Sequence, residues 1–442
     1  MGTMREIAAI PVDPRRALVY EHGWQSWSPT AAYRLGARPH RPVSDPVRVM
    51  NYRPDRIPPP DAFWGEGLLA ADPGDGGPIR VFAAPDATGP IPSIRADVRG
   101  ARLIISADAT QGPVTATCDN GPGGLDGALA RWADGFAARS GAARPRPAPS
   151  IWCSWYHYFT QVTEADIDEN VAAMDALGLP VNVVQIDDGY QAEIGDWLIP
   201  SGRFASLPDL VARIRDAGRR AGIWVAPFLA APQSRLAREH PDWLVGGATA
   251  GFNEDWGSEV AAVDVTHPAA AEYLFSVFAT LRTLGIDFFK IDFIYAGALD
   301  GRRHDPTATG LDAYRSGLRL IREAIGPDAY LLGCGAPILP SVGLVDAMRV
   351  SPDTGPNPDP DHGDMSQPAQ RAATLTGRWR AWQDGRFWIN DYDCLLARPA
   401  VPGRTEWAAH LQRFRGLPGS GDRLHDLDPW GLATTRELLT SR

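Results

Sequence analysis

The sequence has few cysteines and no long apolar run, and each lack excludes a class of protein. Four cysteines in 442 residues, none in a CxxC pair, are too few and too scattered for a disulfide framework. No apolar stretch approaches the length of a membrane span, and the N-terminal segment carries acids and prolines where a signal peptide needs an apolar core. These features predict a cytoplasmic protein with no membrane partner.

Positive charge is also scarce, and lysine is almost missing. The formal net charge is −10, and only one of the 43 basic residues, Lys290, is a lysine. This balance argues against nucleic acid as a partner, because nucleic acid selects clustered Lys and Arg. A small neutral substrate fits, and the sequence leaves monomer and homo-oligomer open. Because a chain so poor in lysine keeps Lys290, we expect this position to need a compact ammonium that a planar guanidinium cannot replace.

The chain divides into two regions of different pattern. Residues 1–140 are rich in Pro and Gly and carry short β-like runs, such as Arg102–Asp108, followed by a predicted helix over Gly124–Ser140. We interpret this region as a β-sandwich-like N-terminal domain. Residues 141–150 are Pro-rich and are predicted to be a linker. Residues 151–442 are then expected to form the larger, catalytic domain.

After the linker, short apolar runs alternate with amphipathic stretches, as in a parallel sheet with helical crossovers. Strands are predicted at Ile151–Trp155, Asn182–Asp187, Ile223–Pro227, Asp287–Asp292, Ala329–Cys334, Ala347–Ser351 and Phe387–Asn390. Helices are predicted at Glu164–Leu177, Pro208–Ala221, His267–Leu284, Ala313–Ile325 and Gln367–Gln383. An eighth strand near Gly416–Gly419 and a last helix over Thr434–Leu439 would complete an α/β fold of the (β/α)8 TIM-like barrel type. A doubly wound open sheet is the alternative, but no GxGxxG or GxxxxGK[ST] motif follows a strand.

Polar residues follow nearly every predicted strand, at the end where such a barrel carries its active site. The strand ends hold Asp187-Asp188, Lys290 with Asp292, Cys334-Gly335, Arg349 with Asp353, and Asn390-Asp391. A single Asp after a strand is usually a turn or a helix cap. Acids at several strand ends together indicate one shared cleft.

Side-chain parity sharpens this expectation. Residues i and i+2 of a strand share a face, so Lys290 and Asp292 are both predicted to point into the barrel mouth. Close to a fixed ammonium a carboxylate stays ionised, which suits a nucleophile or an electrostatic stabiliser. An acid on another strand could keep its proton for a leaving group. Two carboxyls about 5–5.5 Å apart would make a retaining glycosidase, and a wider gap an inverting one.

Aromatic residues also gather at strand ends. The cluster Trp152–Tyr158 lies at the end of the first predicted strand, and Trp197 follows the second. Such rings either stack on the apolar face of a sugar or pack the loops against one another. The total of 15 tryptophans favours carbohydrate.

Taken in order, these motifs resemble the melibiase group, the family 36 glycoside hydrolases, and within it the bacterial α-galactosidases. The resemblance covers roughly residues 150–440 and rests on WCSWYHYF, VVQIDDGYQ, GDW, HPDWLV, DFFKIDF, YLLGCGAPILPSVGLVDAMRVSPD and NDYDCLLA. It implies a (β/α)8 barrel that cleaves terminal α-galactosyl residues of a glycoside or oligosaccharide by retaining double displacement. It implies no cofactor and no metal.

The resemblance also implies roles for particular residues. Asp292 matches the catalytic nucleophile, and Asp353 matches the acid/base. Lys290 matches a lysine that hydrogen-bonds sugar hydroxyls, and Asp187 with Asp188 matches the pair that binds the hydroxyls at C4 and C6. Further matches to substrate-binding positions are Trp155, Trp197, Cys334, Gly335 and Arg349.

The chain departs from the common pattern of this family at several places. Ile291 stands where many members have tryptophan, and Ser351-Pro352-Asp353-Thr354 replaces the usual S-D-N-T-D. The C-terminal β-domain of the family is expected to be absent. These departures leave the substrate open between an α-galactoside, an N-acetyl-α-galactosaminide and another α-glycoside, and they leave galactosyl transfer open beside hydrolysis.

Three other interpretations compete with a glycosidase. A Schiff-base lyase could use Lys290, although Asp292 on the same face would keep the amine protonated. A metal-dependent hydrolase could use the acids of Asp353–Asp364, but this segment lacks the spacing of a calcium loop. A non-catalytic carbohydrate-binding protein is the third, and both proposed carboxylates being present gives it no support.

Overall fold

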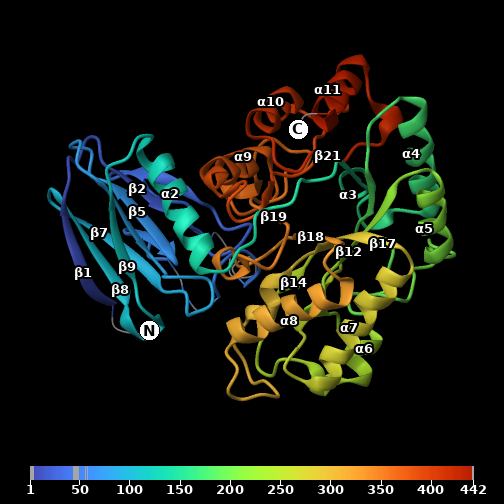
Figure 1. Ribbon diagram of the computed structural model, residues 1–442, viewed down its shortest axis with the longest axis horizontal. Helices are drawn as coiled ribbons and strands as arrows, with labels where there is room; N and C mark the ends of the chain where they lie inside the picture. The colour runs from blue at the N-terminus through green and yellow to red at the C-terminus, as the bar shows by residue number, and fades with distance from the viewer. Residues whose placement is uncertain (1–3, 43–48, 55, 57, 441–442) are drawn as a thin grey trace.

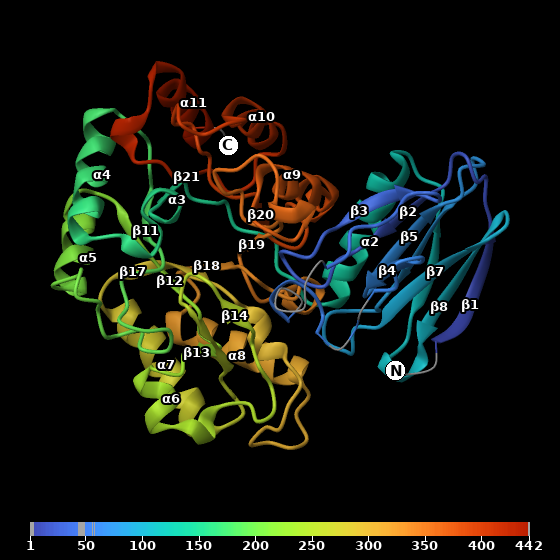
Figure 2. The same ribbon diagram turned by 180° about the vertical axis from the view of Figure 1, so that it is seen from behind.

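The computed structural model describes residues 4–42, 49–54, 56 and 58–440, and it places a pair of antiparallel sheets beside a parallel barrel (Figures 1 and 2). This arrangement confirms the predicted fold class. Within the described ranges, none of the helices has the length and apolar character that crossing a membrane requires.

The N-terminal region is built from two antiparallel sheets. The first has the order β1-β8-β7-β4, with β1 (Met4–Pro11), β4 (Phe63–Glu66), β7 (Ser93–Arg99) and β8 (Arg102–Asp108). The second has the order β3-β2-β5-β6-β9, with β2 (Leu18–Glu21), β3 (Ala31–Arg34), β5 (Leu68–Asp72), β6 (Ile79–Ala83) and β9 (Thr115–Asp119). Buried side chains of both sheets form one cluster, as in a sandwich: Val19, Phe63, Phe82, Ile94 and Leu103 are members.

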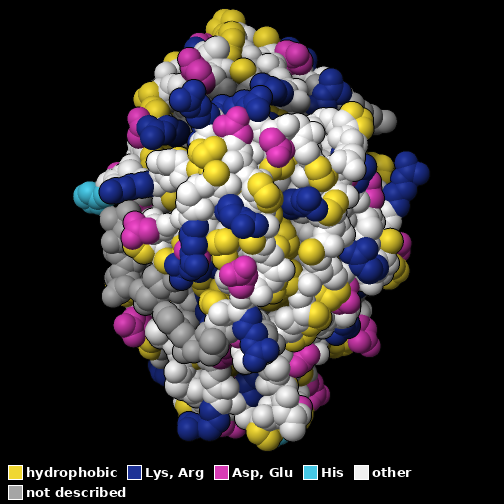
Figure 3. Space-filling model, turned by 90° about the vertical axis from the view of Figure 1, so that its left-hand side faces the viewer, with side chains coloured by type: hydrophobic (Ala, Val, Ile, Leu, Met, Phe, Trp, Pro, Cys, Tyr) yellow, Lys and Arg dark blue, Asp and Glu magenta, His cyan; other side chains and the backbone are white. Residues whose placement is uncertain are grey.

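The surface of this region that faces away from the barrel mixes side chains of every kind. Figure 3 shows hydrophobic, basic and acidic side chains interspersed over it. Helix α2 (Gly124–Arg139) follows the sheets and buries Leu125, Leu129, Trp132 and Phe136, a stripe with helical spacing. The helix therefore forms as the sequence predicts. The boundaries at residues 140 and 150 stay a prediction.

Eight parallel strands form the barrel, in the order β20-β19-β18-β17-β12-β11-β10-β21. Their bounds are β10 (Ile151–Cys153), β11 (Val183–Ile186), β12 (Arg220–Val225), β17 (Ile286–Ile291), β18 (Tyr330–Gly333), β19 (Ala347–Arg349), β20 (Ile389–Asp391) and β21 (Gly419–Ser420). The amide of Leu417, just before β21, donates to the carbonyl of Asn390 in β20 at 2.9 Å. This bond brings the two ends of the sheet together, so the carboxyl ends of all eight strands surround one mouth.

Helices cover the outside of the barrel, as Figures 1 and 2 show. They are α4 (Glu164–Ala176), α5 (Leu207–Asp216), α6 (Arg235–Glu239), α7 (Pro268–Thr283), α8 (Gly310–Ile325), α9 (Gln370–Trp379), α10 (Arg404–Phe414) and α11 (Pro429–Thr440). The short helix α3 (Trp155–Tyr158) instead follows β10 directly, at the carboxyl end of the strands. Short strands also lie in the loops: β13 (Leu229–Ala230), β14 (Phe252–Asn253), β15 (Ser258–Glu259) and β16 (Ala261–Ala262). The predicted helix over Pro208–Ala221 is too long. It ends at Asp216 because Gly218 has a φ of 73°, and β12 begins at Arg220, before the predicted start.

The connection from β18 to β19 contains only a single 3-10 turn, Leu339–Ser341, and the N-terminal region packs against it. The amide of Ser26 donates to the carbonyl of Ala336 at 3.0 Å, and the amide of Ala336 donates to the Ser26 hydroxyl. The buried guanidinium of Arg380 donates to several carbonyls of residues 23–28 in the N-terminal region, among them that of Ser26. It also donates to the carbonyl of Val350, after β19. The N-terminal region is thus fixed against the barrel beside strand β19.

Candidate active site

A cavity of about 410 Å³ opens at the carboxyl ends of the barrel strands. Residues at or after strand ends supply part of its wall: Trp155, Asp187, Asp188, Trp224, Lys290, Asp292, Phe293 and Asp353. Loops supply the rest: Trp27, Met50 and Asn51 of the N-terminal region, 252–256 after β12, and Asn357, Asp361, Ser366, Gln367 and Pro368 after β19. Both proposed catalytic carboxylates therefore face one cavity, as side-chain parity predicts for Lys290 and Asp292.

Lys290 lies deep in this cavity between two carboxylates. Its Nζ donates to Asp187 Oδ2 at 3.0 Å and lies 3.6 Å from Asp292 Oδ2. Burial acts against the charged amine, but the carboxylates of Asp187 and then Asp292 outweigh it and raise the pKa of Lys290 well above its ordinary value. Schiff-base formation needs the neutral amine, which a raised pKa makes scarce, so this geometry disfavours the lyase interpretation.

Two further donors fix the Asp292 carboxylate. The indole Nε1–H of Trp224, within β12, donates to Asp292 Oδ2 at 3.1 Å. The amide of Phe293 donates to Oδ1 at 2.7 Å, and Phe293 has a left-handed φ of 51°, which is unusual for a bulky residue. Backbone strain of this kind persists where the surrounding structure imposes it. Each oxygen of the Asp292 carboxylate therefore accepts a hydrogen bond, and the two bonds fix its orientation.

Asp188 is a second acid at the end of β11, with a different environment from Asp187. Its Oδ2 accepts from Trp256 Nε1–H at 2.8 Å, and its Oδ1 accepts from Gln191 Nε2–H at 2.6 Å. Burial raises the pKa of Asp188 to about 6, despite these donors. Asp187 and Asp188 thus place oxygen acceptors at the closed end of the cavity, beside the Lys290 donor.

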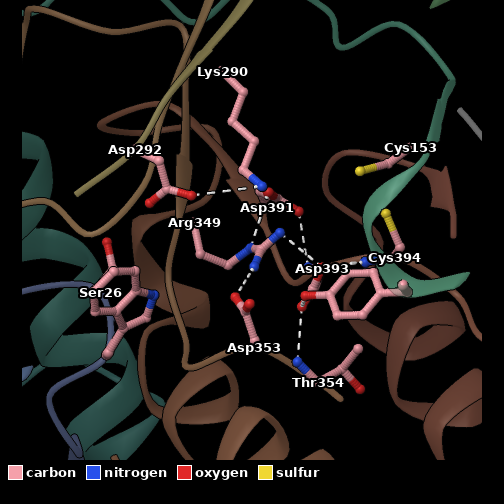
Figure 4. A network of polar contacts seen from close by, with 12 residues as sticks. Ser26, Cys153, Lys290, Asp292, Arg349, Asp353, Thr354, Asp391, Asp393 and Cys394 are labelled. Carbon is pink, nitrogen blue, oxygen red and sulfur yellow. Dashed lines mark hydrogen bonds and ion pairs between the residues drawn. The ribbon is translucent and has the colours of Figure 1, made fainter. Parts of the chain in front are cut away.

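Arg349 forms a second cluster, in which one guanidinium meets three carboxylates (Figure 4). Its Nη1 donates to Asp353 Oδ1 at 2.7 Å, its Nε donates to Asp391 Oδ2 at 3.1 Å, and its Nη2 lies 2.7 Å from Asp393 Oδ1. Asp393 also accepts from the amide of Thr354 at 2.8 Å and from the hydroxyl of Tyr156. One positive charge cannot neutralise three negative ones, two of them buried, so the cluster favours retention of a proton.

The donors around this cluster indicate which carboxyl holds that proton. Asp391 accepts from Arg349 and from the amide of Asp393, and both oxygens of Asp393 face donors. Asp353 faces the cavity, with its Oδ1 bound to Arg349. Burial raises the pKa of Asp353 to about 7, partly offset by Arg349 and reinforced by the charge of Asp393. Asp353 is therefore suited to donate a proton near neutral pH.

Not every residue singled out by sequence borders the cavity. The described wall includes Trp155, Asp187, Asp188, Lys290, Asp292 and Asp353, and it does not include Trp197, Cys334, Gly335 or Arg349. Trp197 is buried and packs edge-on against Trp224, with ring centroids 5.8 Å apart. Cys334 is buried, and the left-handed Gly335 leaves room for Trp27 and Phe293, which a Cβ would meet at 2.8–3.0 Å. Trp197, Cys334 and Gly335 therefore pack behind the residues that form the wall.

The structure adds residues to the site that sequence reasoning did not find. Trp27, Met50 and Asn51 come from the N-terminal region, at least a hundred residues before the barrel begins. Asp393 lies three residues past the end of the expected strand, yet it binds Arg349 directly. The motif NDYDCLLA contains this aspartate, and the second acid in that motif was the available signal.

The chain is similar to known proteins in both sequence and structure. The sequence profile of the Melibiase family matches residues 138–306. The α-galactosidase TtGalA from Thermus thermophilus, solved in complex with p-nitrophenyl α-D-galactopyranoside, superimposes with a TM-score of 0.82 and 30% identity, over 100% of this chain and 90% of that one.

Curated relatives match over shorter stretches. α-Galactosidase AgaA from Geobacillus stearothermophilus is 26% identical over 200 residues, which are 42% of this chain and 26% of that protein. The Escherichia coli α-galactosidase is 30% identical over 128 residues, covering 26% of this chain and 18% of that protein. The matched stretches thus span about a quarter or less of these curated relatives. The full-length likeness to the Thermus thermophilus enzyme shows that the chain belongs to the melibiase group, the family 36 glycoside hydrolases.

Proposed function

We propose that the protein hydrolyses terminal α-galactosides with retention of configuration, through a covalent glycosyl-aspartate. The observation that carries the proposal is the pairing of two unlike clusters on one cavity. One cluster holds Asp292 beside a protonated amine, and the other favours a proton on Asp353. Double displacement needs one carboxylate and one carboxylic acid of this kind.

In the first step, Asp353 donates its proton to the glycosidic oxygen while an oxygen of Asp292 attacks the anomeric carbon. The bond to the leaving group breaks, and a bond from the sugar to Asp292 forms on the opposite face. The donors at Trp224 and Phe293 orient the attacking carboxylate before the substrate arrives.

In the second step, the roles of the two carboxyls are exchanged. Asp353, now a carboxylate, accepts a proton from a water molecule as that water attacks the anomeric carbon. Asp292 leaves, and the sugar is released with its original α configuration. The pKa of about 7 at Asp353 suits a group that must give a proton in one step and take one in the next.

The closed end of the cavity is suited to a neutral sugar. Lys290 donates, and Asp187 and Asp188 accept, in the positions where hydroxyls of a terminal residue would lie. Sugar hydroxyls both donate and accept, so they can satisfy this mixed set. The assignment of these three residues to hydroxyl binding rests on this arrangement and on the family resemblance.

The proposal includes a cytoplasmic location, which fits four cysteines that are all free, three of them buried. Cell fractionation of the native host tests it. A protein recovered outside the cytoplasm would contradict this part alone.

A screen of aryl α-glycosides, with the anomeric configuration of the first product followed by NMR, tests the proposal. We expect turnover of p-nitrophenyl α-galactoside, with α-galactose appearing before mutarotation. First formation of β-galactose would contradict double displacement. Turnover of the N-acetyl-α-galactosaminide in preference to the galactoside would replace the substrate and keep the mechanism.

A further inference from the structure

The hairpin formed by β14 and β15 lines the cavity with residues that have no role in the proposed reaction. Five consecutive residues, 252–256, line the cavity, and they come from the long segment between β12 and β17. None of the five is required as a nucleophile or a proton donor. Because they line the same cavity, we expect them to contact another part of the substrate.

The hairpin is held rigidly over the cavity. Asn253 Oδ1 accepts from the amides of Asp255 and Trp256 at 2.9 and 3.2 Å, which fixes the turn. Trp256 reaches inward to donate to Asp188, and its ring lies 4.9 Å from that of Phe293. At the base, the Tyr295 hydroxyl donates to the carbonyl of Ala250. Because the segment is fixed at its base and at its tip, the side chain of Phe252 is held in a defined position.

The exposed fraction of the side chains that line the cavity increases from Asp187 and Asp188 toward Phe252, and this gradient indicates how the substrate lies. Asp187 and Asp188 are buried at the closed end, and the side chain of Asp292 is 8% exposed. The side chain of Asp353 is 28% exposed, and Phe252 is 44% exposed. The acid that protonates the leaving group thus lies on the solvent side of the nucleophile. The leaving group must depart toward the mouth, where Phe252 lies.

We propose that the β14–β15 hairpin forms the leaving-group subsite, with Phe252 as an apolar platform for the aglycone or the next sugar. The inference rests on the proposed hydrolysis of α-galactosides. An exposed Phe on a rigid turn offers an apolar face at low entropic cost, since few rotamers are lost on contact. Phe252 acts on binding and positioning of the departing group and touches no reacting atom.

Charge at the mouth narrows the class of leaving group. Glu254 and Asp255 on the hairpin and Asp361 on the loop after β19 line the cavity. Lys290, the basic residue in the described wall, lies deep and is already paired with Asp187 and Asp292. Like charges repel across such a cavity, so the subsite takes neutral or cationic leaving groups and rejects anionic ones.

The test compares Phe252→Ala with the wild-type protein on two substrates of different leaving-group size. For p-nitrophenyl α-galactoside we expect KM to rise about tenfold, because the aryl group loses its platform. For α-galactosyl fluoride, whose leaving group is a single atom, we expect less than about a twofold change. Phe252→Tyr should restore the aryl KM. Phe275→Ala, which removes a 37% exposed Phe on α7, is the matched control and should change neither.

Two results would overturn the subsite. Equal changes on both substrates, or no change on either, would mean that Phe252 does not contact the leaving group. A wild-type protein that turns over neither substrate would instead remove the proposed function, and the subsite with it.

The charge selection is tested separately. Wild type should prefer 4-aminomethylphenyl to 4-carboxyphenyl α-galactoside, and Glu254→Gln with Asp255→Asn should reduce that preference. Equal turnover of the two by wild type would remove the charge selection.

Discussion

The two cation–carboxylate clusters of the active site use the same kinds of groups and reach opposite results. Lys290 has two carboxylates, Asp187 and Asp292, within 3.6 Å of its Nζ. Arg349 has three within 3.1 Å of its nitrogens, one of which is Asp353. In the first cluster, the carboxylates raise the pKa of Lys290 despite its burial, so the amine keeps its proton. In the second, burial and the charge of Asp393 raise the pKa of Asp353 against the effect of Arg349, so a carboxyl favours keeping a proton.

The choice of cation also differs for a physical reason. A planar guanidinium presents donors in several directions and can bind three carboxylates at once, whereas a compact ammonium fits between two. Each cluster also contains a bulky or acidic residue with a left-handed backbone: Phe293, with a φ of 51°, and Asp393, with a φ of 87°. The proposed acid and the proposed nucleophile are both aspartates, so the difference between them comes from their partners.

The largest effect is expected from removing the proposed nucleophile. Asp292→Asn should lower kcat/KM for p-nitrophenyl α-galactoside on the order of 10⁴-fold or more, because the amide cannot form the covalent intermediate. Steady-state kinetics with a thermal unfolding control measure this. A variant that folds and keeps turnover within tenfold of wild type would place the nucleophile elsewhere.

Removing the acid should give a large effect that depends on the leaving group. Asp353→Asn should lower kcat/KM by about 10²–10⁴-fold for an alkyl or sugar leaving group, which needs protonation. The loss should be much smaller with α-galactosyl fluoride, because fluoride leaves without a proton. Equal losses on both substrates would show that Asp353 does not act as the acid.

Exchanging the cation tests the Lys290 side of the comparison. Lys290→Arg keeps the charge but replaces a compact ammonium by a larger fork, which should shift Asp187 and Asp292. We expect a loss of about 100-fold in kcat/KM, comparable to the cost of misplacing a catalytic group by an ångström. Arg371→Lys, at an exposed pair with Asp359, is the control. Wild-type kinetics in Lys290→Arg would show that charge alone is sufficient.

The smallest effect is a shift of the pH profile. Asp353 must be protonated in the first step, so kcat/KM should fall as pH rises through about 7. The negative charge of Asp393 helps to raise the pKa of Asp353, so Asp393→Asn should lower that pKa and move the alkaline limb to lower pH. Asp359→Asn, at an exposed site on the following loop, should leave the profile unchanged. A limb that moves to higher pH would contradict the coupling between the two carboxyls.

Much of the barrel and the centre of the site could be predicted from the sequence. Periodicity locates the strands, and the carboxyl ends of parallel strands meet at one mouth, so acids after several strands were expected to converge. Parity placed Lys290 and Asp292 on one face, and both line the cavity. Local rules suffice here because strand geometry fixes where successive side chains point.

The outer parts of the site were not predictable in the same way. Trp27 reaches the cavity because its loop packs against Ala336 and Arg380, and such contacts between distant segments leave no periodic signal. Strand parity also cannot say whether a residue after a strand points into the cavity or behind its wall. Parity therefore could not predict that Trp197 and Cys334 lie behind the wall.

The identity of the nucleophile is the central claim, and trapping the covalent intermediate tests it most directly. A slowly hydrolysed fluorinated α-galactosyl fluoride, incubated with the full-length protein and followed by peptide mass spectrometry, should label one carboxylate. We expect the added mass on the peptide that contains Asp292, and none on the same peptide from Asp292→Asn. A label on Asp353, or on any other acid of the cavity, would contradict the assignment.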